Sequence, residues 1–312
     1  MIVKQQYSLL VPCYNATNFI SGFLENLEKL TLPFDEVIFY DDASTDDTAN
    51  MLLALGYHVI QGTINSGPAY ARNKLIEAAH FDWIHFHDID DFMDPAFLDK
   101  TSMLAKKELF DVILCNVDWY DACSKELVLS WIYRQDQIDA HALNYTISHP
   151  IGGINGLYRK ETLIEAGGFN ADIRIWEDAD MHVRLAGINA RFCIVEEVLS
   201  YAYRYAETAS SDQKRAWLIR AGQLWNYYHS YVHSDTRLEI GRQSQLAAAA
   251  LLLSGCGQAA RKALQLSELC GVKVPVSQKL HWRIYKGILP LFLRIELRLV
   301  HLKFAFRKKI TF

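Results

Sequence analysis

Three acidic residues stand within four positions after a short apolar segment. Asp88, Asp90 and Asp91 directly follow the segment WIHFH. Carboxylates crowded in this way repel one another unless a cation is present, and hard oxygen ligands suit Mg²⁺ or Mn²⁺. The alternative is a cluster that caps a helix. Because Asp94 before Pro95 can already cap that helix, the triplet is left free to bind a metal.

A second acidic pair, Asp41 and Asp42, ends the segment DEVIFYDD. A carboxylate at this point can accept a hydrogen bond from the imide N–H of a pyrimidine. The alternative is a capping box for the following helix, which the residues from Ser44 to Asp47 match. That alternative explains Ser44 and the later acids, but it does not explain Asp41 and Asp42.

The segment NSGPAYARN, at residues 65–73, indicates a loop that leads into a helix. Asn65 lies in the loop, and Gly67 with Pro68 begins the helix. The free N–H groups of a helix start favour an anion. Arg72, one turn further on, either adds positive charge to this site or is a solvated helical residue.

Glu177 and Asp178 follow Trp176. Adjacent acids beside an aromatic ring can have a raised pKa, and one of them could then act as a general base. The alternative is an ordinary helix start, since acids are common at the positive end of a helix. Arg204, in the segment YRY, either reaches a diphosphate or packs against its neighbours.

The elements that must position these clusters alternate along the chain. Short apolar runs predict strands, and apolar residues at helical spacing predict helices. The predicted strands are 7–12, 35–40, 57–61, 83–87 and 112–117, and the helices between them are 18–30, 48–55, 69–79 and 95–107. This alternation predicts an α/β fold with a Rossmann-like, doubly wound and mostly parallel sheet. Ligands bind beyond the carboxyl ends of the strands in such sheets, and the acidic clusters fall there.

Length and composition indicate a folded protein with one large domain or two modest ones. The chain has 312 residues, of which 51% are hydrophobic and 22% charged, which excludes a disordered or low-complexity protein. Residues 118–200 are less regular, 206–212 have the composition of a linker, and helical patterns follow from residue 214. We therefore predict an α/β domain at 1–210 and a helical C-terminal region at 211–312.

Cysteine usage and hydropathy indicate the compartment. The six cysteines form no C-x-x-C pair, which argues against a zinc ribbon or a redox motif. The N-terminus has too short an apolar stretch for a signal peptide, and no uninterrupted apolar run is long enough to span a bilayer. We therefore expect a cytoplasmic protein.

Charge is distributed unevenly along the chain. From Lys279 onward there are nine Lys or Arg and one acid, Glu296, which gives this segment a charge of +8. Because the net charge of the chain is −4, residues 1–278 carry −12. An acidic body argues against nucleic acid as a partner. The tail at 287–309 leaves two interpretations open. It packs against the rest of the chain or forms a homodimer contact, or it binds an anionic surface on the cytoplasmic face of the inner membrane as a peripheral anchor.

Six motifs, in order, resemble those of the family-2 glycosyltransferases with the GT-A fold. The resemblance covers about residues 7–205. The motifs are VPCYN at 11–15, DDASTDDT at 41–48, NSGPAYARN at 65–73, HDIDD at 87–91, GGF at 167–169 and EDADMHVRL at 177–185. Each motif is weak alone, but six in the same order are not expected by chance.

The resemblance implies an inverting transfer of one sugar from a nucleotide-diphosphate sugar, most often a UDP-sugar. The acceptor would be a hydroxyl of a glycan or lipid-linked glycan, as in surface polysaccharide or lipopolysaccharide assembly, and the cofactor Mn²⁺ or Mg²⁺. The residues it assigns are Pro12, Tyr14, Asp41, Asp42, Asn65, Gly67, Arg72 and Asp88 to the nucleotide, Asp90 with Asp88 to the metal, Asp178 as the catalytic base, and Glu177, Arg184 and Arg204 to accessory roles.

Departures from the family pattern bear on the type of enzyme. Processive members carry a Q-x-x-R-W motif, whereas here Gln278 precedes Trp282 and Arg283 with different spacing, so we expect a non-processive enzyme. Two other functions remain open. A sugar-nucleotide pyrophosphorylase would need a Gly- and Arg-rich N-terminal loop that is absent after the first strand. A non-catalytic nucleotide-sugar-binding module would not need the four acids Asp42, Asp88, Asp90 and Asp178.

Overall fold

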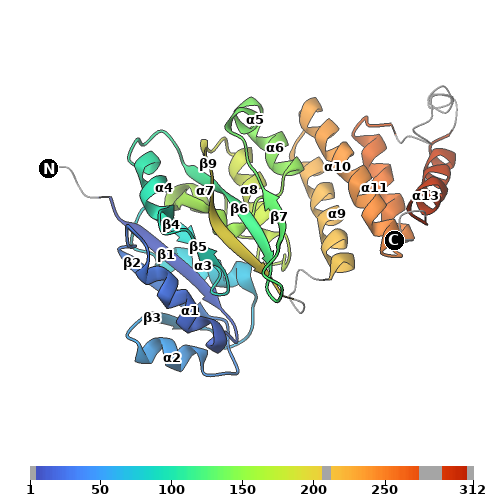
Figure 1. The fold of residues 1–312 in the computed structure, drawn as a ribbon. Helices are drawn as coiled ribbons and strands as arrows, with labels where there is room; N and C mark the ends of the chain where they lie inside the picture. Colours follow the sequence, from blue (N-terminus) through green and yellow to red (C-terminus); the bar gives the residue numbers. More distant parts are fainter. Residues whose placement is uncertain (1–4, 206–211, 274–289, 308–312) are drawn as a thin grey trace. The chain divides into compact units, whose positions relative to one another are not determined.

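The computed structural model describes residues 5–205, 212–273 and 290–307 (Figure 1). The chain divides into two compact units, one formed by Met1–Thr146 and Pro150–Thr208 and the other by Ile147–His149 and Ala209–Phe312. The predicted domain boundary at 210/211, most of the predicted linker, and the Gln278, Trp282 and Arg283 positions lie outside the described residues.

The first half of the larger unit forms the parallel part of one sheet. β1 pairs in parallel with β2 and with β4, and β2 pairs in parallel with β3. Helices connect these strands, as the periodicity predicts. The elements are β1 Tyr7–Cys13, α1 Thr17–Glu28, β2 Glu36–Asp41, α2 Thr48–Ala54, β3 His58–Gln61, α3 Pro68–Ala78, β4 Trp83–Phe86, β5 Phe92–Met93 and α4 Phe97–Ala105.

The second half continues the sheet with mixed pairing. The strand order is β3-β2-β1-β4-β8-β6-β9-β5, with β7 paired to β6. β8 is antiparallel to both β4 and β6, whereas β9 is parallel to β6. The elements are β6 Val112–Asp121, β7 Leu127–Trp131, α5 Gln135–Ala140, α6 Ala142–Ser148, the 3₁₀ turn η1 Gly153–Asn155, β8 Gly156–Arg159, α7 Lys160–Glu165, α8 Glu177–Gly187 and β9 Phe192–Arg204.

The predicted α/β fold with helices on both faces of the sheet is confirmed. The sheet is mixed rather than mostly parallel, because β8 runs antiparallel to β4 and β6, β7 to β6, and β5 to β9. Successive strand residues alternate between two cores, as the two-residue period of a strand requires. One core contains Leu10 with Leu75 of α3 and Leu185 of α8. The other contains Leu9 with Phe23 of α1, together with buried residues of α2 and α4. Residues 118–200, which the sequence pattern left irregular, contain the short elements β7, α5, α6, η1, β8 and α7 together with the longer α8 and β9.

The second unit is helical, as predicted. Its helices are α9 Gln213–Ser230, α10 Ser234–Leu253, α11 Gly257–Leu269 and α13 Leu291–Arg307. Figure 1 shows α10 and α11 side by side, and their shared core includes Leu251 and Leu264. None of the described helices is both long and apolar enough to cross a membrane.

The described part of the tail packs within this helical unit. Ile295 and Leu299 of α13 are buried in the core that α10 and α11 form. Arg294 forms an ion pair with Glu268 over 2.6 Å, and Glu296 forms one with Arg261 over 2.5 Å. The described residues of the tail therefore pack against other helices of the same chain, which is one of the two interpretations left open by the sequence.

Candidate active site

The ends of three neighbouring strands bring the acidic clusters together. β1 lies between β2 and β4, and Cys13 at its end is in register with Asp41. Burial, followed by the charges of Asp41, Asp88 and Asp90, raises the pKa of the Cys13 thiol well above its usual value. The carboxylates at the ends of β2 and β4, which are 47 or more positions apart in the sequence, therefore lie close to the same buried thiol.

The two acids at the end of β2, Asp41 and Asp42, have different hydrogen-bond partners. Asp42 accepts hydrogen bonds from the backbone N–H groups of Ser66 (2.8 Å) and Gly67 (2.7 Å). Asp41 accepts one from the Ser44 N–H through Oδ2 at 3.2 Å, while its Oδ1 is buried and has no partner among the described residues. Asp42 thus orders the next loop, and Asp41 keeps an oxygen able to accept from a ligand.

The capping box that was the alternative for the residues from Ser44 to Asp47 does not form. α2 begins at Thr48, so Ser44 lies four residues before the helix and its hydroxyl accepts the Asn15 N–H at 2.9 Å. Asp46 instead bonds the Thr48 N–H at 3.1 Å and the Thr17 hydroxyl at 2.8 Å. These contacts join the loops that follow β1 and β2.

The other residues assigned to the nucleotide lie on these same loops. Pro12 is half-buried in β1, and Tyr14 has 50% of its surface exposed just beyond the strand. Gly67 has φ of 91°, a conformation that glycine tolerates, and it precedes Pro68 at the start of α3 as expected. Asn65 accepts two hydrogen bonds from Arg174, at 3.4 Å on Oδ1 and 3.3 Å on its carbonyl.

Arg72 is buried rather than solvated, and it joins two of the acidic clusters. Its guanidinium donates to Asp88 Oδ1 at 2.7 Å and to Glu177 Oε1 at 2.9 Å. It also lies over the ring of Phe169, with its Cζ 5.4 Å from the ring centroid. Arg72 and Glu177 are 105 positions apart in the sequence. The guanidinium therefore fixes the start of α8 to the end of β4.

The acid triplet after β4 does not act as a single group. Asp91 is buried and accepts the backbone N–H of Tyr203 at 2.8 Å, so it holds β9 in place. Burial and then the charge of Asp88 raise the pKa of Asp90 to about 6. Burial, with Asp90 and Asp91 next, also raises the pKa of Tyr205 to about 12. Asp90, and the oxygen of Asp88 that Arg72 does not bond, therefore remain in the triplet for a ligand.

Asp178 sits at the start of α8 in a partly desolvated position. The side chain is half-buried, and its Oδ1 accepts the Ala179 N–H at 2.7 Å. Burial, and then the charge of Glu177, raise the pKa of Asp178 to about 7. Asp178 can therefore take up a proton near neutral pH, while Glu177 is held in an ion pair with Arg72.

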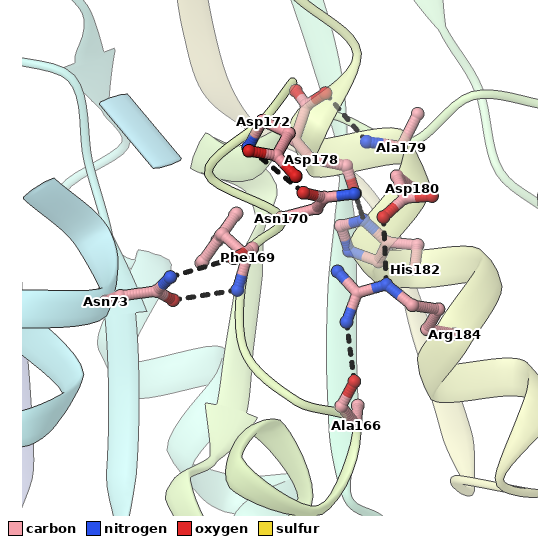
Figure 2. Close-up of polar contacts among 10 residues, drawn as sticks. All are labelled: Asn73, Ala166, Phe169, Asn170, Asp172, Asp178, Ala179, Asp180, His182 and Arg184. Atoms are coloured by element: carbon pink, nitrogen blue, oxygen red, sulfur yellow. Dashed lines mark hydrogen bonds and ion pairs between the residues drawn. The ribbon is translucent and has the colours of Figure 1, made fainter. Parts of the chain in front are cut away.

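The approach to α8 is braced from both sides (Figure 2). Asn73 of α3 donates to the Phe169 carbonyl at 2.8 Å and accepts the Phe169 N–H at 2.8 Å.

Trp176, the residue before α8, has φ of 69°. A positive φ is a true outlier for so bulky a side chain, and such strain collects at functional sites.

Two accessory predictions have structural explanations. Arg184 bonds Asp180 at 2.8 Å and the Ala166 carbonyl at 2.5 Å, so it ties α8 to the preceding turn (Figure 2). Arg204 is exposed at the end of β9, where it is in register with Asp121. The described contacts of these two arginines do not include Asp88, Asp90 or Asp178.

One pair beneath the site has no clear signal in the sequence. The Nε2 atom of His182 lies 2.9 Å from the hydroxyl of Tyr158, and its Nδ1 lies 2.8 Å from the Asp178 carbonyl. Both side chains are fully buried. A histidine four positions after an acid on a helix was the only hint, and its partner on β8 is visible only in the fold.

The comparisons with known proteins agree with this architecture. The sequence model of Glycosyl transferase family 2 matches residues 8–165, just over half of the chain. The chain belongs to glycosyl transferase family 2. It is similar to the uncharacterized glycosyltransferase YibD of Escherichia coli, with 32% identity over 128 residues that cover 40% of this chain and 36% of YibD.

A second family relative is similar in both sequence and structure. The poly(ribitol-phosphate) β-N-acetylglucosaminyltransferase TarS of Staphylococcus aureus is 31% identical over 119 residues, which cover 36% of this chain and 21% of TarS. The crystal structure of TarS 1-349 with UDP-GlcNAc matches with a TM-score of 0.67 at 18% identity, over 98% of this chain and 92% of that one. The chain thus spans about a third or less of the full length of these two relatives in sequence.

A more distant structure has the same fold. The mannosyltransferase PcManGT from Pyrobaculum calidifontis, in complex with GDP-Man and Mn²⁺, matches with a TM-score of 0.59 at 16% identity, over 96% of this chain and 88% of that one. At such identities the likeness establishes the fold alone. The predicted GT-A fold with additional C-terminal helices is therefore confirmed.

Proposed function

We propose that this family member moves one sugar from a nucleotide-diphosphate sugar to a hydroxyl group, with inversion at the anomeric carbon. The observation that supports this most is the position of Asp178. Its half-buried carboxyl has a pKa near 7 and lies close enough to Glu177, Arg72 and Asp88 for their charges to act on it. A base with this pKa can remove a proton from a hydroxyl at neutral pH.

The loops after β1, β2 and β3 are the proposed site for the nucleotide. The free Oδ1 of Asp41 would accept a base N–H, while Asp42 holds the 65–67 loop through Ser66 and Gly67. Of the two acids that the family resemblance assigns to the nucleotide, Asp41 would thus contact the base and Asp42 would order the loop. Pro12 and exposed Tyr14 would flank the base. We propose a UDP-sugar first, as in the TarS complex, with a GDP-sugar second.

Asp88 and Asp90 fit a divalent cation. Among the described residues no three His, Cys, Asp or Glu side chains form a metal cluster by themselves. Mg²⁺ and Mn²⁺, however, often bind one or two carboxylates together with substrate phosphates. Burial and then the charge of Asp88 raise the pKa of Asp90, and a bound cation would offset that charge. When bound, the cation would neutralise charge on a diphosphate leaving group. Asp90 would hold it, with Asp88 as the second carboxylate and as a ribose contact.

One base suffices for such a transfer. Asp178 would accept the proton of the acceptor hydroxyl as its oxygen attacks the anomeric carbon. The bond from that carbon to the diphosphate breaks, and its electron pair leaves with the diphosphate. For the acceptor we propose a glycan or lipid-linked glycan of a bacterial surface polymer, since ExoU of Rhizobium meliloti, 28% identical over 183 residues, is named for succinoglycan biosynthesis. A single sugar would be added in each encounter.

Nucleotide binding with and without metal tests this function. Calorimetry should detect UDP or GDP binding to the wild type that strengthens with Mn²⁺. Asp90→Ala should remove the effect of the metal, because one of two carboxylate ligands is lost. Asp99→Ala, at an exposed acid in the first turn of α4, is the matched control and should behave like the wild type. Unchanged metal dependence in Asp90→Ala would show that the metal binds elsewhere.

A further inference from the structure

Two adjacent glycines pass between Arg72 and an indole ring in the larger unit. A β-carbon on Gly153 would lie 3.6 Å from Cζ of Arg72. A β-carbon on Gly152 would lie 3.1 Å from Cζ3 of Trp131, which is closer than ordinary van der Waals contact. Both glycines are buried. The lack of side chains here therefore lets Trp131 approach the backbone next to the candidate active site.

Trp131 is a neighbour of the proposed base. The position of a β-carbon on Gly152 is also 3.8 Å from Oδ2 of Asp178 and 3.8 Å from Oδ1 of Asn155. An aromatic ring, a carboxylate oxygen and an amide oxygen thus surround one point on the backbone. None of these three residues follows another in the sequence, since they come from β7, η1 and α8.

A second tryptophan orients the first. Trp119 on β6 packs against Trp131, with ring centroids 5.0 Å apart and planes inclined at 58°. Such a tilted pair limits the rotation of both rings. Trp131 itself is only half-buried at the end of β7. It therefore keeps part of its surface accessible while its orientation is fixed.

The polar groups beside the ring include unused hydrogen-bonding capacity. Asn155 is completely buried and donates to the Cys115 carbonyl at 3.3 Å, but its Oδ1 has no partner among the described residues. A buried amide oxygen without a partner costs free energy. The cation next to Gly153, Arg72, is already bonded to Asp88 and Glu177. The free groups here are thus neutral or acidic.

We infer that Trp131, Asn155 and Asp178 form the subsite for a pyranose ring of the acceptor. The C–H face of the ring would lie on Trp131, and Asn155 Oδ1 would accept from a ring hydroxyl. The reacting hydroxyl would give its proton to Asp178 while its oxygen bonds the anomeric carbon of the donor. This inference rests on the proposed function and specifies its acceptor as a neutral sugar ring rather than a phosphorylated polyol, which would require a free cation.

Saturation-transfer NMR with simple sugars tests the subsite. The probes are methyl β-D-glucopyranoside, methyl β-D-galactopyranoside and ribitol 5-phosphate, each added to the full chain with UDP or GDP and diamagnetic Mg²⁺. At least one pyranoside should receive saturation on its C–H groups. Trp131→Ala should weaken its binding about 10-fold, and Trp131→Phe, which keeps an aromatic face, should weaken it less. Trp225→Phe removes a half-buried indole from the helical unit and is the matched control.

Several results would overturn the inference. These are no pyranoside binding to the wild type, equal pyranoside binding in all variants, or binding of ribitol 5-phosphate alone. Trp131→Phe keeps the test valid if thermal melting shows that Trp131→Ala does not fold. The nucleotide signals in the same samples separate the two levels of the argument. Loss of all nucleotide binding would reject the proposed function, whereas bound nucleotide with Trp131-independent sugar binding would reject only the subsite.

Discussion

Replacing Asp178 with Asn should stabilise the folded protein while it removes the proposed base. The pKa of Asp178 rises from an ordinary value of 3.8 to about 7 in the fold. At about 1.4 kcal/mol for each pKa unit, ionisation of this group would cost up to about 4 kcal/mol of stability. Because the side chain is only half-buried, solvent screening reduces the expected gain to about 1–2 kcal/mol. The amide oxygen of Asn can still accept the Ala179 N–H.

The gain must depend on pH in one direction. A carboxyl whose pKa is higher in the folded state than in the unfolded chain loses stability as the pH rises from about 4 to about 7. The side chain of Asn at position 178 carries no charge at any pH in this range. Its advantage should therefore be small at pH 4, grow through pH 5 and 6, and become constant above about pH 7.

Thermal melting at pH 5, 6, 7 and 8 measures this difference. An increase of about 2–4 °C per kcal/mol is expected for a unit of this size. Asp172→Asn is the matched control, because Asp172 is an exposed acid in the loop before α8. It should show no such pH dependence. The raised pKa of Asp178 is refuted if Asp178→Asn is stabilised equally at every pH, or is less stable than the wild type at pH 8.

Four further outcomes follow from the site. Arg72→Met should destabilise the fold by about 3 kcal/mol in urea denaturation, since it leaves Glu177 buried without its cation; wild-type stability would contradict the network. Tyr158→Phe should cost about 1–2 kcal/mol, because His182 loses its buried hydroxyl partner, and an unchanged denaturation midpoint would argue against that bond. Asn73→Ala removes two hydrogen bonds to one backbone and should cost about 1–3 kcal/mol by the same measurement; a neutral result would remove its bracing role. The kcat/KM should rise with pH up to about 7 and then level off, because the base must be deprotonated, and a profile flat from pH 5 to 8 would exclude this base.

The sequence was informative where local pattern determines position. Apolar runs located β1, β2 and β4, and parallel pairing then placed Asp41 and Asp88 at one edge of the sheet. Gly67 and Pro68 marked the start of α3 correctly. These predictions needed only strand length, helical spacing and turn residues, which short segments encode.

Contacts between distant segments were not predictable in this way. Asp91 bonds Tyr203, which is 112 positions away, and Arg72 bonds Glu177 across 105 positions. Such pairs depend on how α8 and β9 of the second half pack against the first half, which local sequence pattern does not encode. The contact of Trp131 with Gly152 was unpredictable for the same reason, because it forms only when β7 lies beside the segment that leads into η1. The sequence therefore identified the acids, but not which of them bond other parts of the chain instead of a ligand.

Turnover of nucleotide-sugars by the wild type and by Asp178→Asn tests the proposed chemistry most directly. UDP- and GDP-sugars with Mn²⁺ are supplied with a methyl pyranoside, and both the nucleoside diphosphate released and the glycosidic product are quantified. The wild type should form both products, and Asp178→Asn should be slower by about 10²–10⁴-fold while it still binds the nucleotide. Near-normal turnover by Asp178→Asn, or no turnover of any nucleotide-sugar by the wild type, would contradict the assignment of Asp178 as the base of a glycosyl transfer.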